Sequence, residues 1–256
     1  MISDNIQSVR QRIAGCCEKS GRRPEEVRLI CVTKTASVGQ IEEALAAGVA
    51  ALGENRIQDA VAKHAVIGDR AQWHLIGHLQ TNKARDAVKI FSLIHSVDTI
   101  RLAKKIDKEA AKLGKIQDIL IQVNPVRNII SNGVNTSGEA SKFGIEPGKA
   151  EGFIKEVTLY PNINIKGLMT IAPEVDDLEK VRPYFRALRE LKDRLSLVKI
   201  GTVPTLVKPL PGGQSPFLPI LSMGMTDDFE VAIEEGSNMV RIGRAIFRND
   251  QCPMSQ

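Results

Sequence analysis

The sequence predicts an α/β fold, namely a single (β/α)8 barrel of the TIM type with an extra N-terminal helix. Short apolar runs typical of buried parallel strands alternate with amphipathic runs typical of helices along the chain. The length of 256 residues suits one such domain, since these barrels usually take about 250 residues. An open doubly wound sheet is the alternative, but the glycine-rich turn that it normally places after its first strand is missing at 34–37.

The expected elements follow one another in a regular order. A helix over 3–20 comes first, with Ile6, Val9 and Ile13 on its apolar side. The expected strands span residues 27–34, 50–54, 72–78, 92–97, 117–123, 164–170, 218–222 and 239–243. The expected helices between them span residues 38–47, 56–66, 81–89, 99–113, 147–158, 176–195 and 227–235.

Three glycines and one apolar stripe indicate helix ends and faces. Because glycine tolerates the positive φ of a helix C-cap, three helices are expected to end at Gly48, Gly114 and Gly236. The helix over 176–195 is expected to bury the side chains that recur at helical spacing, which are Leu178, Val181, Phe185 and Leu188.

Composition argues against nucleic-acid and membrane partners. The chain has 35 basic and 30 acidic residues, and the basic ones are scattered rather than gathered on one face, as nucleic-acid binding would require. No segment approaches the roughly 18 to 20 uninterrupted apolar residues of a membrane span. The N-terminus has neither the basic start nor the apolar core of a secretory signal. We expect one domain over 1–256 that acts in the cytoplasm.

The cysteines and histidines show no metal-ligand spacing. The cysteines are Cys16, Cys17, Cys31 and Cys252, and none belongs to a C-x-x-C pattern. They are expected to be reduced thiols, with Cys31 a small residue of the core. His74 and His78 fall on one face of the same expected strand, but no carboxylate or thiolate pattern accompanies them. No metal site is expected.

Two segments at opposite ends of the chain carry the strongest chemical signal. The apolar run 27–34 ends in Lys34, which places an amine at the carboxyl end of a strand, where α/β proteins locate their chemistry. The run 240–244 contains Gly243, which lets backbone N–H groups approach an anion closely. An amine and a phosphate cradle on one rim indicate a phosphorylated carbonyl compound bound as an imine, and pyridoxal 5′-phosphate fits best. Taken alone, a lysine such as Lys34 at a strand end is most often a solvated charge.

Four further motifs lie between these two segments. In chain order they are Leu52-Gly53-Glu54-Asn55-Arg56, the run 73–83 from Trp73 to Lys83, Ser141-Lys142-Phe143-Gly144, and Leu221-Ser222-Met223-Gly224-Met225. With these motifs, the chain from about residue 3 to residue 247 closely resembles the YggS/PROSC family of pyridoxal phosphate homeostasis proteins. The resemblance implies a barrel like that of alanine racemase and pyridoxal phosphate held as a lysine aldimine. It implies no settled catalytic reaction.

The resemblance also implies roles for residues at the ends of the strands. Lys34 matches the Schiff-base lysine, and burial among strand ends is expected to favour its neutral, reactive form. Ser222 matches a serine that contacts phosphate, and the backbone N–H groups of Gly243 and Arg244 are expected to complete the phosphate cradle. Many relatives carry threonine where this chain has Arg244, so a side-chain hydroxyl contact would be lost there.

The remaining expected contacts concern the cofactor ring. Arg241 resembles the arginine that faces the pyridine nitrogen in alanine racemase, where it keeps that nitrogen unprotonated and weakens the ring as an electron sink. Asn55, His78 and Met223 are expected to line the cofactor. For His78 the alternative is a satisfied core histidine. Two further methionines, Met169 and Met225, either pack on the ring or belong to the plain core.

Two functions of different classes are compatible with this sequence. The first is a non-enzymatic protein that buffers or delivers pyridoxal phosphate, with PLP-requiring apo-enzymes as possible partners. The second is a PLP-dependent amino-acid racemase of the alanine racemase type, which needs a second base on the opposite face of the cofactor. The tyrosines of this chain, Tyr160 and Tyr184, are expected away from the rim, which favours the binder. A monomer is expected.

Two stretches look like additions to the family pattern. The first spans 125–135 and is flanked by Val-Asn pairs at 123 and 134. The second spans 200–208 and is flanked by Leu-Val-Lys at 197 and 206. A loop after a strand lies on the catalytic rim of a barrel and a loop before a strand on the opposite face, so only the first is expected near the cofactor.

Overall fold

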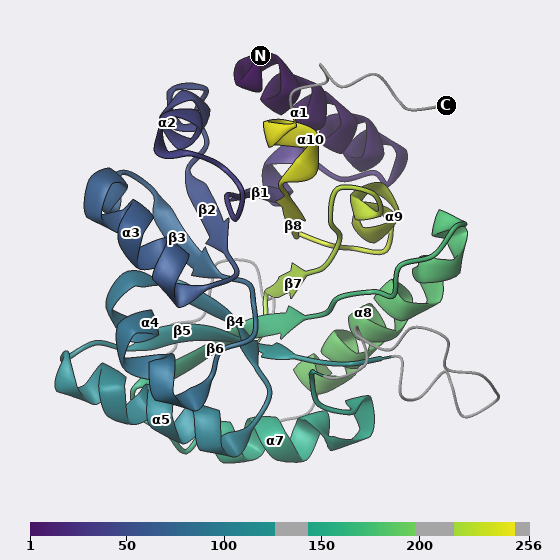
Figure 1. Ribbon diagram of the computed structural model, residues 1–256. Coiled ribbons are helices and arrows are strands. Elements are labelled where there is room, and N and C mark those ends of the chain that lie inside the picture. Colours follow the sequence, from purple (N-terminus) through teal and green to yellow (C-terminus); the bar gives the residue numbers. More distant parts are fainter. Residues whose placement is uncertain (126–142, 198–217, 249–256) are drawn as a thin grey trace.

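The strands form a closed parallel barrel in chain order, which confirms the predicted fold. The computed structural model describes residues 1–125, 143–197 and 218–248 (Figure 1). Each strand pairs with the next, and β8 closes the barrel on β1. The strands are β1 (Arg28–Val32), β2 (Ala51–Glu54), β3 (Gln72–Leu75), β4 (Leu93–Val97), β5 (Gln117–Gln122), β6 (Ile163–Met169), β7 (Ile220–Ser222) and β8 (Met239–Ile242).

Helices surround the barrel in Figure 1, so the strands are covered on their outer faces. The helices are α1 (Ile2–Lys19), α2 (Val38–Ala46), α3 (Ile57–Ile67), α4 (Ala84–Ile90), α5 (Ile100–Lys112), α7 (Ala150–Val157), α8 (Arg182–Leu197), α9 (Phe229–Glu234) and α10 (Arg244–Phe247). The predicted N-terminal helix is α1, which packs against α9 and α10 through Ile6, Val9 and Ile13. A 3-10 turn over Leu178–Val181 precedes α8, where one continuous helix was predicted.

The predicted helix ends and most of the predicted helix face are confirmed. Gly48, Gly114 and Gly236 have φ angles of 79°, 61° and 96° directly after α2, α5 and α9. Of the expected stripe near α8, Val181, Phe185 and Leu188 are buried, as predicted. Leu178 is 39% exposed, so the prediction that it is buried is wrong; it begins the 3-10 turn and lines a cavity described below.

The core has two parts, because successive side chains of a strand point to opposite faces. The larger part lies between the helices and the outer faces of the strands. It includes Cys31, as predicted, and burial raises the pKa of this thiol to about 12. The smaller part consists of strand residues only, which are Ile30, Ala51, Leu93, Leu120, Met169 and Met239. Met169 therefore belongs to the plain core, one of the two alternatives for this residue.

Polar side chains form the next layer inside the barrel. On β4, β7 and β8 the residue two positions after an apolar core residue is polar, and the pairs are Leu93 and His95, Ile220 and Ser222, and Met239 and Arg241. All three polar residues are buried. Residues two apart share a strand face, so a polar layer lies above the apolar one, nearer the carboxyl ends of the strands.

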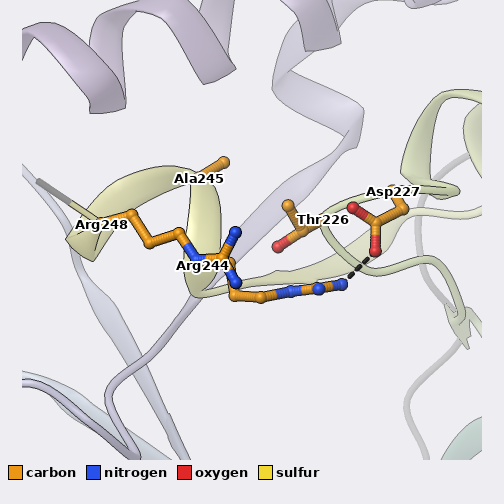
Figure 2. A pocket seen from close by; sticks show the side chains of 5 residues that line it. All are labelled: Thr226, Asp227, Arg244, Ala245 and Arg248. Carbon is orange, nitrogen blue, oxygen red and sulfur yellow. Dashed lines mark hydrogen bonds and ion pairs between the residues drawn. The ribbon is translucent and has the colours of Figure 1, made fainter. Parts of the chain in front are cut away.

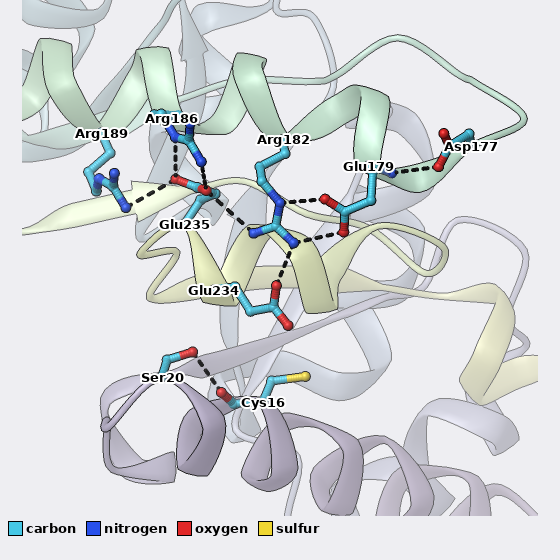
Figure 3. Close-up of polar contacts among 9 residues, drawn as sticks. All are labelled: Cys16, Ser20, Asp177, Glu179, Arg182, Arg186, Arg189, Glu234 and Glu235. Carbon is cyan, nitrogen blue, oxygen red and sulfur yellow. Dashed lines mark hydrogen bonds and ion pairs between the residues drawn. The ribbon is translucent and has the colours of Figure 1, made fainter.

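An ion-pair network joins α8 to the end of α9, away from the barrel interior (Figure 3). Glu235 is almost fully buried and pairs with Arg186 at 2.9 Å and Arg189 at 3.0 Å. Arg182 bridges Glu234 and Glu179, each at 2.6 Å. The network fixes α9, the helix that follows the β7 loop, against the outer layer.

Some boundaries differ from the predicted ones. β1 ends at Val32 and β3 ends at Leu75, so Lys34 and His78 lie in loops beyond the strands. Of the two stretches interpreted as additions, 200–208 and all of 125–135 except Pro125 lie outside the described residues. Within the described part of the chain, no helix is both long enough and apolar enough to cross a membrane.

Candidate functional site

A cavity of about 820 Å³ opens at the carboxyl ends of the barrel strands. Its volume lies within the range of roughly 300 to 1,000 Å³ that is typical of small-molecule sites. Five of the eight residues that the sequence predicted for the cofactor line it, and these are Lys34, Asn55, Arg241, Gly243 and Arg244. They follow or end β1, β2 and β8, so the structure brings together residues that are far apart in the sequence.

Lys34 stands on a turn just beyond β1, and a buried ion pair anchors the residue before it. The Lys63 amine donates hydrogen bonds to the Thr33 carbonyl at 2.5 Å and to Glu54 Oε1 at 2.7 Å. Thr33 Oγ1 donates to the same carboxylate oxygen at 2.6 Å. Glu54 therefore neutralises Lys63 rather than Lys34.

The Lys34 side chain is exposed, so the expectation that strand ends bury it is wrong. The reason is that β1 ends two residues earlier, at Val32. Within the described part of the chain, the Lys34 amine has no hydrogen bond or ion pair. A lysine that lines a cavity and has no partner of its own is available to react with a ligand there.

Asn55 and His78 differ in their relation to the cavity. Asn55 directly follows β2, is exposed and lines the cavity. His78 is exposed but does not line the cavity. Its ring stacks on Phe143, with ring centroids 4.0 Å apart and an angle of 22° between the ring planes. It is not a core histidine, and its predicted contact with a cofactor remains a prediction that this geometry does not favour.

Arg241 projects from β8 into the polar layer and reaches the cavity. Its Nη1 donates to the Ser222 carbonyl at 2.8 Å and to Ser222 Oγ at 2.7 Å, and its Nη2 donates to the Thr170 carbonyl at 2.9 Å. Burial lowers the pKa of Arg241 to about 10, and the nearby Asp228 opposes that shift. The guanidinium is therefore still charged at neutral pH, and its observed partners are Ser222 of β7 and Thr170, directly after β6.

Ser222 and Met223 lie beneath the cavity rather than in its wall. Both are fully buried, and neither lines the cavity. The Ser222 hydroxyl is already engaged by Arg241 and by His95 Nδ1, the latter at 3.0 Å. The residues of the same loop that do line the cavity are Met225, Thr226, Asp227 and Asp228. The hydroxyl positioned for a ligand is therefore that of Thr226, which the sequence analysis did not single out.

A smaller hollow of about 210 Å³ shares Thr226, Asp227 and Arg244 with the cavity (Figure 2). It is lined by Thr226, Asp227, Arg244, Ala245 and Arg248. Figure 2 shows the Arg244 side chain extended toward Asp227, with which it forms an ion pair. Two arginines and one carboxylate leave the hollow with a net positive charge, as suits an anion.

Gly243, which lines the larger cavity, is needed for close packing. A Cβ at this position would lie 2.9 Å from the Val32 carbonyl oxygen and 3.1 Å from the Val32 Cβ. The glycine therefore lets β8 approach β1 at the point where the cavity wall begins. The sequence analysis expected Gly243 to allow the close approach of an anion, and that contact stays a prediction.

Two buried histidines complete the floor of the site, and the sequence analysis did not connect them with it. His95 Nε2 lies 3.1 Å from His74 Nδ1, and both rings are buried. Burial lowers the pKa of His74 to about 3 and that of His95 well below its usual value. The available signal was a histidine at an inward position of an otherwise apolar strand, Leu93-Ile94-His95-Ser96-Val97.

Comparison with known proteins decides the family. The family model for the alanine racemase N-terminal domain matches residues 2–250. The pyridoxal phosphate homeostasis protein of Aquifex aeolicus is 38% identical over 95% of this chain and 96% of its own length. The protein of the same name from Escherichia coli K12 is 34% identical over 96% of this chain and 95% of its own. The chain belongs to the pyridoxal phosphate homeostasis protein family. The membership that the motifs indicated is thus confirmed.

Solved structures agree with this membership. The homeostasis-family protein PipY of Synechococcus elongatus, solved with PLP bound, has a TM-score of 0.75 and 31% identity, over 97% of this chain and all of PipY. Alanine racemase of Clostridium difficile has a TM-score of 0.67 and 16% identity, over 96% of this chain and 57% of the racemase. At that identity the racemase shares the barrel fold alone.

Proposed function

We propose that this protein binds pyridoxal 5′-phosphate in the cavity at the carboxyl ends of its strands and serves in PLP and amino-acid homeostasis. The observation that carries the proposal is that Lys34 and Arg241 line one cavity together with Gly243. PLP, when bound, supplies an aldehyde that forms a Schiff base with a lysine amine. Among the described residues, Lys34 is the lysine that lines this cavity. The name of the curated relatives and the PLP-bound structure of PipY support PLP as the ligand.

Other residues at the cavity are suited to the ring nitrogen and the phosphate group of PLP. Arg241 is a charged donor beside the cavity, and a donor that faces the pyridine nitrogen keeps it unprotonated. At the other end, the Thr226 hydroxyl and the backbone N–H groups of Gly243 and Arg244 are suited to the phosphate. In this proposal Thr226 replaces Ser222, whose hydroxyl is engaged below the cavity.

The cavity lining favours a binder over a racemase. Arg241 does not separate the two functions, because alanine racemase places a similar arginine at the ring nitrogen. Racemisation needs a base on each face of the ring. Among the described residues, the cavity lining contains no tyrosine. We propose a non-catalytic carrier, monomeric and cytoplasmic, that delivers PLP to apo-enzymes that require it.

Covalent labelling tests the proposal. The purified protein is loaded with PLP, reduced with borohydride and digested, and the modified lysine is located by mass spectrometry. We expect the adduct on Lys34, and its loss in Lys34→Ala with the circular dichroism spectrum unchanged. Lys108→Ala, at an exposed position of α5, is the matched control and should retain the adduct. An adduct on another lysine in the unsubstituted protein would overturn the assignment.

A further inference from the structure

A chain of hydrogen bonds crosses the interior of the barrel beneath the cavity. It begins at His74 on β3, passes to His95 on β4 at 3.1 Å, and continues to Ser222 on β7 at 3.0 Å. It ends at Arg241 on β8, whose Nη1 lies 2.7 Å from Ser222 Oγ. All four side chains are buried. Four strands thus contribute to one polar connection whose last member lines the cavity.

The donors and acceptors of this chain can be assigned from Arg241, because a guanidinium only donates. Ser222 Oγ accepts from Arg241, and its own hydroxyl proton then has one acceptor among the described residues, His95 Nδ1. His95 therefore carries its proton on Nε2 and donates it to His74 Nδ1. Reversing any link would leave a buried proton without an acceptor, which is costly.

The assignment requires both histidines to be neutral. A protonated His95 would have a proton on Nδ1 and could not accept from Ser222. Burial together with the nearby charge of Arg241 lowers the pKa of His95, and burial lowers that of His74. The charge at one end of the chain therefore helps to keep the other members uncharged.

The chain also determines which N–H groups of Arg241 remain for a ligand. A guanidinium has five N–H donors. Three of them are directed at the Ser222 carbonyl, Ser222 Oγ and the Thr170 carbonyl, which leaves two. The planar group cannot turn without breaking these bonds, so its orientation toward the cavity is fixed.

We propose that His74, His95 and Ser222 are positioning residues that hold the Arg241 guanidinium so that its free N–H groups face the ring nitrogen of bound PLP. The inference rests on the proposed function, since it assumes PLP in the cavity. It deepens that function by assigning a role to three residues outside the cavity wall. An apolar interior layer is what barrels of this type usually have, and it would fill the same space without any need for satisfied hydrogen bonds.

The first test uses the unsubstituted protein without PLP. Nitrogen-15 NMR of protein labelled at histidine reports which ring nitrogen carries the proton. We expect neutral His74 and His95 at pH 7, each with its proton on Nε2. A proton on His95 Nδ1, or a charged His95, would overturn the chain. This outcome does not depend on PLP binding, so it is separate from a failure of the proposed function.

The second test compares two substitutions that keep different halves of the His95 ring. His95→Asn places an amide oxygen where Nδ1 lies and retains an acceptor for Ser222, whereas His95→Gln reaches toward His74 and loses that acceptor. The readout is the nitrogen-15 shift of PLP labelled at its ring nitrogen. We expect His95→Asn, which keeps the acceptor for Ser222 but loses the link to His74, to fall between the unsubstituted protein and the other two variants. His95→Gln and Ser222→Ala should move the shift toward that of PLP in water and release PLP several-fold faster.

A purely structural role gives a different pattern. In that case all three variants lose thermal stability while the ring-nitrogen shift stays at its original value, and the proposal is wrong. If the variants do not fold, a charged His95 or a proton on its Nδ1 in the unsubstituted protein still overturns the proposal. If the unsubstituted protein does not bind PLP, the proposed function fails first, and the tautomers then show only that the chain exists.

Discussion

Gly77 lies directly against the backbone of Asn55. A Cβ at position 77 would stand 2.3 Å from the Asn55 carbonyl oxygen and 2.7 Å from its Cα. Real Cβ atoms do not approach backbone atoms so closely, so the loop after β3 can pack on the loop after β2 only with glycine here. Since Asn55 lines the cavity, this contact helps to fix one part of the cavity wall.

We expect Gly77→Ala to displace Asn55 and to weaken PLP binding. The added methyl group meets backbone rather than a flexible side chain, so the protein should lose about 1 to 3 kcal/mol of unfolding free energy, as in other overpacked sites. Urea denaturation measures the loss and equilibrium dialysis measures PLP retention. Gly152→Ala is the control, because nothing lies within 4 Å of its Cβ and it stands inside α7. Gly152→Ala should stabilise the protein slightly. If Gly77→Ala and Gly152→Ala changed the free energy of unfolding equally, the packing argument for Gly77 would be wrong.

Thr226→Val should weaken PLP retention by about 1 to 2 kcal/mol, which is roughly tenfold in affinity, because one charge-assisted hydrogen bond to phosphate is lost. Valine has the shape of threonine, so the substitution preserves the walls of the cavity and of the smaller hollow, both of which Thr226 lines. Spectroscopic titration with PLP gives the affinity. Thr226→Ser keeps the hydroxyl and should retain most of the affinity for PLP. An unchanged affinity in Thr226→Val would mean that another residue binds the phosphate of PLP.

Lys63→Met should destabilise the protein by about 3 to 5 kcal/mol, because it leaves the Glu54 carboxylate buried without its cation. Glu54 is fully buried, and it also holds Thr33, the residue before Lys34. Guanidinium denaturation measures the loss. Adding Glu54→Gln to Lys63→Met should recover most of it, since the neutral amide can still accept from Thr33.

The Lys63 prediction has a matched control on the surface. Lys155→Met removes an ion pair to Glu151 in which both side chains are about half exposed. Exposed pairs contribute little, so this variant should unfold almost like the original protein. If Lys63→Met behaved like Lys155→Met, the buried pair would not be what anchors the end of β1.

The sequence predicted the barrel and the two ends of the site for the same physical reason. Parallel strands need long apolar runs, and these are visible in the sequence, as is the residue that follows each run. Lys34 and Gly243 could therefore be placed on one rim without any structure. The lengths of the apolar runs predicted less reliably where each strand ends. β3 stops at Leu75, which moves His78 from the strand to a loop stacked on Phe143.

The polar floor of the site could not be predicted, because its contacts join distant strands. His95 and Ser222 are 127 positions apart and meet only because the barrel closes. The alternation of inward and outward residues on β7 places Ser222 inside, below the rim, whereas Thr226 lies in the loop at the rim. The family motif indicated that Ser222 contacts the phosphate. It could not show that Thr226, later in the same segment, is the residue whose hydroxyl reaches the cavity.

The two buried histidines predict how stability depends on pH. The pKa of His74 is lowered to about 3 by burial, and that of His95 is lowered in the same direction. In the unfolded chain a histidine has a pKa of about 6.5. Below that pH the unfolded state binds protons that the folded state does not. The stabilisation is therefore fully present above about pH 6.5 and is lost as the pH falls toward 3.

Each histidine should lower the free energy of unfolding by about 1.4 kcal/mol for each pH unit below 6.5. Urea denaturation at about pH 7, 6 and 5 measures the slope before most carboxylates begin to titrate. His95→Asn removes one of the two groups and should halve the slope. Equal stability at pH 7 and pH 5 in the unsubstituted protein would mean that these histidines accept protons in the folded state, and the neutral chain beneath Arg241 could not then exist.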